Sequence, residues 1–170
     1  MRATLMAGFA RRDLIPAALL ALALAASGAV TAWIWSVLAP RVQVVMTAEG
    51  PVLRDIHTED WVAGDMAYGL IVLVAGLAAG LIAYSLRRWR GPTMLLALMV
   101  GSLAGAVICA WLGPTFDAEA YRRLVETAPV GRQFGRPADL RATGLVLVQP
   151  MAAVISYVVC AAWSRSPDLS

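Results

Sequence analysis

Four long apolar stretches dominate this chain and constrain what it can fold into. They cover residues 14–38, 62–86, 93–112 and 145–163, and the one charged residue inside them is Asp65, near the start of the second. A bilayer core about 30 Å thick is crossed by a helix of about 20 apolar residues, which is close to the length of each stretch. We therefore predict an all-α membrane protein with four transmembrane helices, forming a single integral membrane domain over residues 1–170.

Composition supports this class and excludes others. Hydrophobic residues make up 60% of the 170 residues, which is too apolar for a soluble globule of this size and leaves no room for a separate soluble domain. The basic residues are all arginine and are scattered, so we expect a lipid bilayer and no nucleic acid as partner. Cys109 and Cys160 lie near the ends of adjacent antiparallel spans, on the order of 20 Å apart at the helical rise per residue, and should be free thiols.

The N-terminus has some features of a secretion signal. Arg11 and Arg12 precede the first apolar stretch, which contains small residues typical of a cleavage site. The stretch continues to Leu38, however, whereas the apolar part of a signal peptide covers about 7–15 residues. An uncleaved first span is therefore the favoured interpretation, and a cleaved signal is the alternative.

Arginine distribution predicts the orientation. The side that holds both termini and the link between the second and third spans has seven arginines and two acids, and the other side has seven arginines and nine acids over longer loops. The short link contains Arg87, Arg88 and Arg90 with no acid, and such segments stay in the cytoplasm. We predict a bacterial cell-membrane protein with both termini cytoplasmic. Six tryptophans should anchor the span ends in the headgroup region, at positions Trp33, Trp35, Trp61, Trp89, Trp111 and Trp163.

Two glycine pairs predict close helix packing. Gly76 and Gly80 in the second span, and Gly101 and Gly105 in the third, each form a GxxxG pattern that lets helix backbones approach. We expect the two glycine faces to meet each other or to face the first and fourth spans. Homodimerisation through them is a less favoured alternative, and a third alternative is that the glycines reflect only composition.

The spans lack the groups that move charge across a membrane. No Asp, Glu, Arg or His lies near the middle of a span, whereas proton relays, voltage sensors and many coupled transporters need such residues. Gln149 and Pro150 lie one turn into the fourth span, where proline either bends the helix start or is tolerated.

The first outer loop, residues 39–61, should contain a β-hairpin. Residues 41–46 include three β-branched valines and partly alternate between apolar and polar side chains, Glu49-Gly50-Pro51 is typical of a turn, and Val52-Leu53 returns the chain. Two strands are marginal alone, so the hairpin should pack on the second loop or on a partner. The acidic cluster that follows contains Asp55, His57, Glu59 and Asp60. One histidine among three carboxylates could bind a divalent cation, but metal ligands must converge in space and these are nearly consecutive. We therefore predict a solvated turn and no metal or cofactor site, with a cation site as the less favoured alternative.

The second outer loop, residues 113–144, should contain a short amphipathic helix over residues 117–128, lying at the membrane surface. Residues 131–137 read as irregular. The two loops together are predicted to form a small extracytoplasmic cap with an apolar core drawn from Val44, Met46, Val52, Leu53, Phe134 and Leu140. Acids of the first loop should face arginines of the second, and the candidate partner surface comprises Asp55, Glu59, Asp60, Arg132, Phe134, Arg136 and Arg141.

Three motifs carry a resemblance to a known family. They are Trp35 with Leu38-Ala39-Pro40-Arg41-Val42, then Trp111-Leu112-Gly113, and the pattern Gly131-x-x-Phe134-x-x-Pro137-x-x-Leu140-Arg141-Ala142-x-Gly144. Over Trp35 to Trp163 the chain resembles an uncharacterised actinobacterial family of four-span membrane proteins, grouped as a domain of unknown function. The resemblance implies a multi-pass cell-membrane protein and implies no activity.

Three functions follow from these observations. The favoured one is a non-enzymatic accessory or interaction subunit of a cell-envelope complex, bound to a membrane-protein partner, with no catalytic residues. The second is a component of a small oligomeric transporter or channel. The third is an envelope enzyme that would have to use Asp55, His57 and Glu59 for acid–base chemistry, with Arg132 or Arg136 binding an anionic group. The sequence leaves the oligomeric state open.

Overall fold

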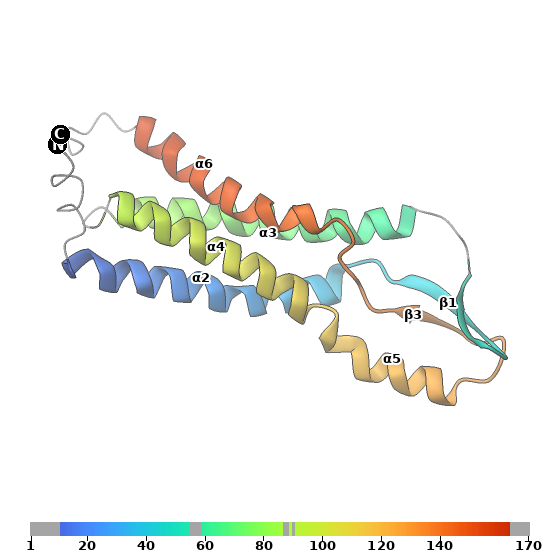
Figure 1. Ribbon diagram of the computed structural model, residues 1–170. Helices are drawn as coiled ribbons and strands as arrows, with labels where there is room; N and C mark the ends of the chain where they lie inside the picture. The colour runs from blue at the N-terminus through green and yellow to red at the C-terminus, as the bar shows by residue number, and fades with distance from the viewer. Residues whose placement is uncertain (1–10, 55–58, 87–88, 90, 164–170) are drawn as a thin grey trace.

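The computed structural model describes residues 11–54, 59–86, 89 and 91–163, and in it a bundle of four long helices carries a small sheet and a further helix at one end (Figure 1). The bundle helices are α2 (Arg11–Leu38), α3 (Glu59–Ser85), α4 (Pro92–Leu112) and α6 (Val148–Trp163). All four span candidates are long and apolar enough to cross a membrane, which confirms that part of the prediction. A 3₁₀ helix, η2 (Thr143–Leu147), leads directly into α6 and belongs to the fourth candidate span.

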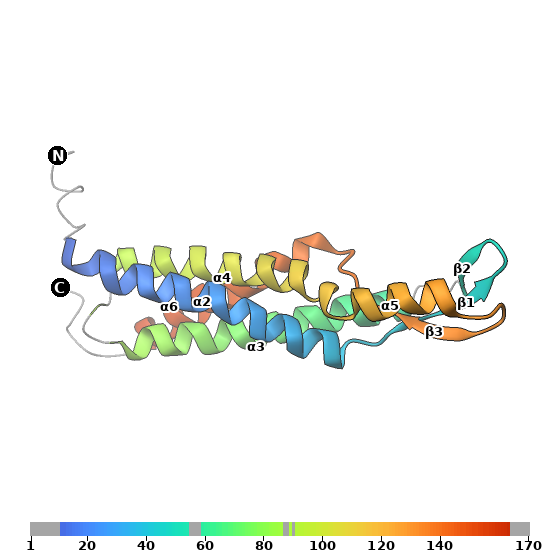
Figure 2. The ribbon, with the colours of Figure 1, turned by 90° about the horizontal axis from the view of Figure 1, so that it is seen from below.

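The helices pack as two pairs. α2 packs mainly on α4, and α3 packs mainly on α6, while α4 also contacts α6. Because successive helices run in opposite directions, the two members of each pair run parallel (Figures 1 and 2). The start of α2, the end of α3, the start of α4 and the end of α6 therefore lie at the same end of the bundle, which we call the far end.

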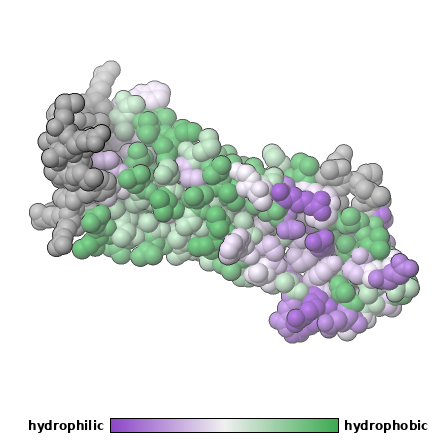
Figure 3. Space-filling view, viewed as in Figure 1, coloured by the Kyte–Doolittle hydropathy of each residue, from purple (hydrophilic) through white to green (hydrophobic). Residues whose placement is uncertain are grey.

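Two apolar clusters close the interior of the bundle at different depths. Toward the sheet, the cap-end cluster contains Trp35, Tyr68, Val72 and Cys109, with Ala32 and Ala39. Toward the opposite end, the far-end cluster contains Leu98, Ala153 and Tyr157, with Ala79 and Ala83. The outside of the bundle is also apolar, and Figure 3 shows polar residues gathered at the cap end of the face it presents. A surface of this kind is expected of helices that meet lipid on their outer side.

The fourth span begins with a 3₁₀ segment, and Pro150 follows it in the first turn of α6. Proline has no backbone N–H, so it fits best in the first turn of a helix, where the N–H groups have no intrahelical acceptor. Pro150 is the third residue of α6 and follows the change from 3₁₀ to α geometry. Two outcomes were predicted for Pro150, a bent helix start or a proline tolerated in the first turn, and the structure shows the second.

The sheet contains three strands in the order β2-β1-β3, and both pairings are antiparallel. The predicted hairpin is present as β1 (Val42–Thr47) and β2 (Gly50–Leu53). Its turn has Gly50 at φ 125°, a conformation that favours glycine, and the Thr47 hydroxyl donates to the Gly50 carbonyl at 2.6 Å.

The prediction of irregular structure for residues 131–137 was wrong, because part of this segment forms the third strand. β3 (Gln133–Arg136) pairs with β1, placing Phe134 opposite Val44. Gly131 has φ 90° and its N–H donates to the Met46 carbonyl, so the chain reverses there and joins the sheet. Four residues that include a glycine are too weak a pattern to identify a strand that a neighbouring strand stabilises.

The predicted amphipathic helix is present as α5 (Thr115–Thr127), but its placement differs from the prediction. It follows α4 after a short turn and runs onward beside the sheet, in the direction away from the bundle (Figures 1 and 2). The half-buried positions Asp117, Tyr121, Leu124 and Ala128 share one side of α5. This side packs toward β3, whereas the prediction placed it against the membrane surface. We call α5 together with the three strands the cap.

One tryptophan does not have the predicted anchoring role. Trp35 is fully buried in the cap-end cluster, where its indole N–H donates to the Gly64 carbonyl at 3.2 Å and its ring packs edge-on against Tyr68. Trp33 and Trp111 are exposed, as membrane anchors would be. Trp33 and Trp35 are two residues apart on one helix and point in different directions, so one is exposed and the other is buried.

Candidate functional site

The cap is a two-layer unit with its own apolar core. Val42, Val44 and Phe134 are buried on one face of the sheet, and the ring of Tyr121 on α5 lies 5.7 Å from that of Phe134. Phe134 is 7% exposed, so its assignment to the partner surface was wrong, whereas its assignment to the cap core is observed.

Two other residues predicted for the cap core lie elsewhere. Val52 is 53% exposed because it is paired with Val45, whose side chain points to the face opposite that of Val44. Leu140 is half-buried and packs against the cap-end cluster of the bundle. Met46 and Leu53 are half-buried, so the cap core is smaller than predicted.

Polar contacts connect the two halves of the cap. The guanidinium of Arg41, just before β1, donates to the Asp117 carboxylate on α5 at 2.8 Å. The guanidinium of Arg54, just after β2, donates to the Gln133 side-chain oxygen on β3 at 2.9 Å. These exposed contacts fix the relative positions of the two loops, though each contributes only about 0–1 kcal/mol to stability.

A second set of contacts joins the cap to the bundle. The residues that make them are called the junction cluster: Trp61, Asp65, Arg136 and Arg141. The guanidinium carbons of Arg141 and Arg136 lie 3.4 Å and 5.5 Å from the centre of the Trp61 ring. The Asp65 carboxylate accepts hydrogen bonds from the backbone N–H groups of Arg141 and Ala142, at 3.1 Å and 3.0 Å. Asp65 thus stabilises the start of the fourth span from α3, and Trp61 packs against both arginines.

These contacts differ in part from the predicted pairing of acids with arginines. Asp55 and His57 lie outside the described residues, and Glu59 and Asp60 are described only as the first residues of α3. Arg136 lies near Asp139 at 3.9 Å, within its own loop. Arg132 takes part through its backbone, since its carbonyl accepts from the Met46 N–H at 2.9 Å. Within the described part of the chain, no three His, Cys, Asp or Glu side chains are grouped so that they could hold a metal ion.

The two glycine pairs face the first and fourth spans. A Cβ added at Gly101 would lie 2.7 Å from the Cα of Ala21 on α2, and one at Gly105 would lie 2.6 Å from the Leu24 carbonyl. Similar additions at Gly76 and Gly80 would overlap the backbone of α6, at the carbonyls of Gln149 and Ala153. The glycines thus bring each parallel pair into backbone contact and are buried within the chain, which leaves them no surface for homodimerisation.

Between the two apolar clusters lies a layer of small residues with a polar centre, which we call the middle layer. Gly28 and Gly105 bring α2 against α4 there, Gly76 brings α3 against α6, and Gln149 of α6 points its side-chain nitrogen at Gly105. Ser102 lies on the same side of α4 as Gly105 and is fully buried. Gln149 is 1% exposed, and neither its side-chain oxygen nor the Ser102 hydroxyl has a hydrogen-bond partner among the described residues.

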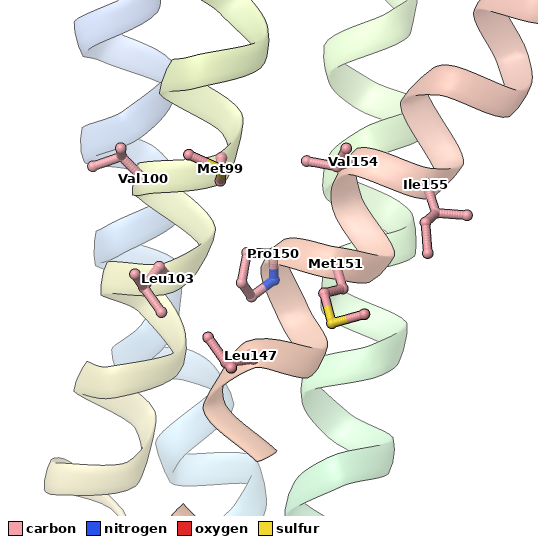
Figure 4. A pocket seen from close by; sticks show the side chains of 8 residues that line it. All are labelled: Met99, Val100, Leu103, Leu147, Pro150, Met151, Val154 and Ile155. Atoms are coloured by element: carbon pink, nitrogen blue, oxygen red, sulfur yellow. The ribbon is translucent and has the colours of Figure 1, made fainter. Parts of the chain in front are cut away.

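A groove of about 410 Å³ lies on the outer side of this layer, between α4 and α6. Figure 4 shows Met99, Val100 and Leu103 of α4 on one side, and Leu147 of η2 with Pro150, Met151, Val154 and Ile155 of α6 on the other. Every lining side chain is apolar, so the groove offers shape but neither hydrogen bonds nor charge. Leu103 and Pro150 are the chain neighbours of Ser102 and Gln149, and they separate the middle layer from the groove.

No family model matches the chain, and neither a curated protein nor a solved structure shows significant similarity to it. The actinobacterial family resemblance therefore stays a prediction from the three motifs.

Sequence reasoning missed three of the contacts described here. Asp65 was counted as an acid of the outer side, although an acid inside an apolar stretch is itself a signal of a specific partner. The pairing of Arg41 with Asp117 joins residues 76 positions apart and has no local signature. Gln149 was noted for its position beside Pro150, and the signal available was that an amide in a transmembrane helix needs a partner.

Proposed function

We propose that this chain is a non-enzymatic accessory subunit of a cell-envelope complex, anchored in the bacterial cell membrane with both termini in the cytoplasm. In this proposal the cap lies outside the cytoplasm and binds a membrane-protein partner. The observation that supports it is that α5 covers one face of the sheet while the described residues leave the opposite face open.

The open face has the composition of a small binding surface. Val52 is 53% exposed beside half-buried Val45, and exposed Gln43, Arg54 and Gln133 surround this valine pair. An apolar centre with a polar rim is the usual anatomy of a protein interface. The bond from Arg54 to Gln133 holds part of this rim in place before any partner binds.

A partner would bind this face through side chains and not by adding a strand. β2 is an edge strand, and the Arg54 N–H donates back to the Gln43 carbonyl at 3.2 Å. Backbone groups alternate in direction along an antiparallel strand, so Pro51 and Leu53 point theirs away from β1. Pro51 has no N–H to offer, and a proline on an edge strand blocks further pairing.

Photo-crosslinking tests this proposal. A photoreactive residue at Val52 should give a crosslinked product of defined mass with one membrane protein, and Val52→Arg should abolish co-purification of that protein in mild detergent. The control is Ala120, which is exposed on α5: Ala120→Arg should leave co-purification unchanged. Equal recovery of the same protein by the Val52→Arg variant would contradict the proposal.

Two alternatives predict different behaviour in the same detergent. A transporter or channel component would purify as an oligomer of this chain alone. Its substrate would have to pass between copies of the chain, because apolar clusters fill each bundle on both sides of the middle layer. An envelope enzyme would purify as a lone monomer and lose activity on a lipid or envelope substrate after replacement of Asp55, His57 or Glu59.

A further inference from the structure

We propose that a water molecule is bound at the centre of the bundle, between the side-chain oxygen of Gln149 and the hydroxyl of Ser102. This goes beyond the proposed function, because it concerns the membrane-embedded bundle and not the cap. Neither of these two polar atoms has a hydrogen-bond partner in the part of the chain that the structure describes.

Both atoms are deeply buried. Gln149 is 1% exposed and Ser102 is fully buried, so neither side chain reaches solvent or lipid. A buried polar group without a hydrogen bond is costly, and such groups in native proteins are generally satisfied by the protein or by an ordered water. The other buried hydroxyls show the usual solution: Thr31 donates to the Gly28 carbonyl at 3.0 Å, and Ser156 donates to the Ala153 carbonyl at 3.1 Å.

The two side chains border the same residue. The Gln149 side-chain nitrogen lies 3.4 Å from the point where a Cβ on Gly105 would be, and Ser102 precedes Gly105 by three residues on the same side of α4. The Gln149 amide and the Ser102 hydroxyl therefore border the same turn of α4. No hydrogen bond joins the two atoms directly, so satisfying both requires a molecule between them.

The chemistry of the site selects the ligand. An amide oxygen can only accept, so the ligand must donate a hydrogen bond, and the serine hydroxyl can either donate or accept. No ionised side chain is among the described buried residues, so a cation would be left without a counter-charge in the apolar interior. The backbone contacts around the glycines leave no space for a large molecule. Water is the ligand that is small, neutral and able to donate twice.

A double-mutant cycle in detergent tests whether one ligand serves both side chains. If Gln149 and Ser102 share a bound water, Ser102→Ala and Gln149→Met should each lower Tm, and the double variant should fall little further than the worse single variant. The control cycle pairs Gln149→Met with Ser156→Ala, whose hydroxyl has a protein acceptor, and these effects should add. A rise in Tm for both single variants, or full additivity between Ser102 and Gln149, would overturn the proposal.

A second measurement uses the unmodified protein and so does not depend on any variant folding. In solid-state NMR with magnetisation transferred from water, the Gln149 side-chain amide should receive an early signal. The indole N–H of Trp35 is the control, because it is equally buried but bonded to the Gly64 carbonyl, and it should receive none. Coupling in the mutant cycle together with no water signal at Gln149 would indicate a direct bond between the two side chains and would also refute the bound water.

Discussion

Replacing Gly101 by alanine tests whether backbone contact between α2 and α4 holds the bundle together. The added Cβ would lie 2.7 Å from the Cα of Ala21 and 2.9 Å from its carbonyl oxygen. Carbon atoms in favourable contact are about 3.5–4.0 Å apart, so α2 would have to move away by about 1 Å. Both neighbours are backbone atoms, which cannot rotate out of the way as the end of a side chain can.

The size of the effect follows from two opposing contributions. Overpacking of a well-packed interior costs about 1–3 kcal/mol, and a radial gap of 0.5–1 Å loses about a quarter to a half of each contact energy along the seam. Alanine is the better helix former by about 1 kcal/mol, which offsets part of this cost. We therefore expect Gly101→Ala to lower the free energy of unfolding by about 1 kcal/mol, a fall in Tm of about 2–4 °C for a chain of this size.

Thermal unfolding in a mild detergent, followed by tryptophan fluorescence, measures this shift. Gly69→Ala is the matched control, because Gly69 lies in the interior of α3 and its added Cβ would meet Leu145 side-chain carbons at an ordinary 3.6 Å. The control should unfold at the wild-type Tm or above it. A Tm for Gly101→Ala that equals that of the control would show that α2 can move without loss and would refute the packing argument.

Three further predictions concern the cap and the topology. Phe134→Ala should expose the cap to proteases far more than Arg136→Ala, because a buried aromatic contributes about 3–5 kcal/mol and an exposed charge about 0–1 kcal/mol; equal cleavage rates would contradict this. Asp65→Ala should speed hydrogen exchange at the start of the fourth span while Asp65→Asn, which keeps an acceptor oxygen, should do so less. An enzyme reporter active only outside the cytoplasm should work when fused after Glu49 and fail after Arg90, and the reverse pattern would invert the orientation.

The four bundle helices could be predicted because each apolar stretch is long and is recognised from consecutive residues. Each span has about 20 apolar residues, so the helices could be placed without knowing what they contact. The glycine pairs predicted close helix packing, but the sequence left open whether the two pairs meet each other or face the first and fourth spans. The structure shows Gly101 against α2 and Gly76 against α6, which is the arrangement of parallel pairs. The choice depends on which non-adjacent helices meet, and no local pattern encodes that.

The cap was predicted only in part because its elements are short and stabilise one another. The hairpin was visible in the alternation of residues 41–46 and the turn at Gly50. β3 was not, because four residues acquire strand geometry only when β1 is beside them. The same dependence explains α5: the sequence showed that the helix has an apolar side but not that a sheet would cover it. The burial of Trp35 was missed because tryptophan suits both a headgroup region and a core.

Asp65 explains how a cap built from two separate loops keeps a fixed position on the bundle. The second loop must return to the fourth span, and the N–H groups at the start of a helix have no intrahelical partner. Asp65 on α3 accepts hydrogen bonds from the backbone N–H groups of Arg141 and Ala142, the two residues just before η2, and so holds the chain where the fourth span begins. Trp61, one turn earlier on α3, packs against Arg141 and Arg136 of the same loop. Trp61 and Asp65 of α3 thus hold both the end of the cap and the start of the fourth span. This contact gives the one acid inside an otherwise apolar stretch a structural role.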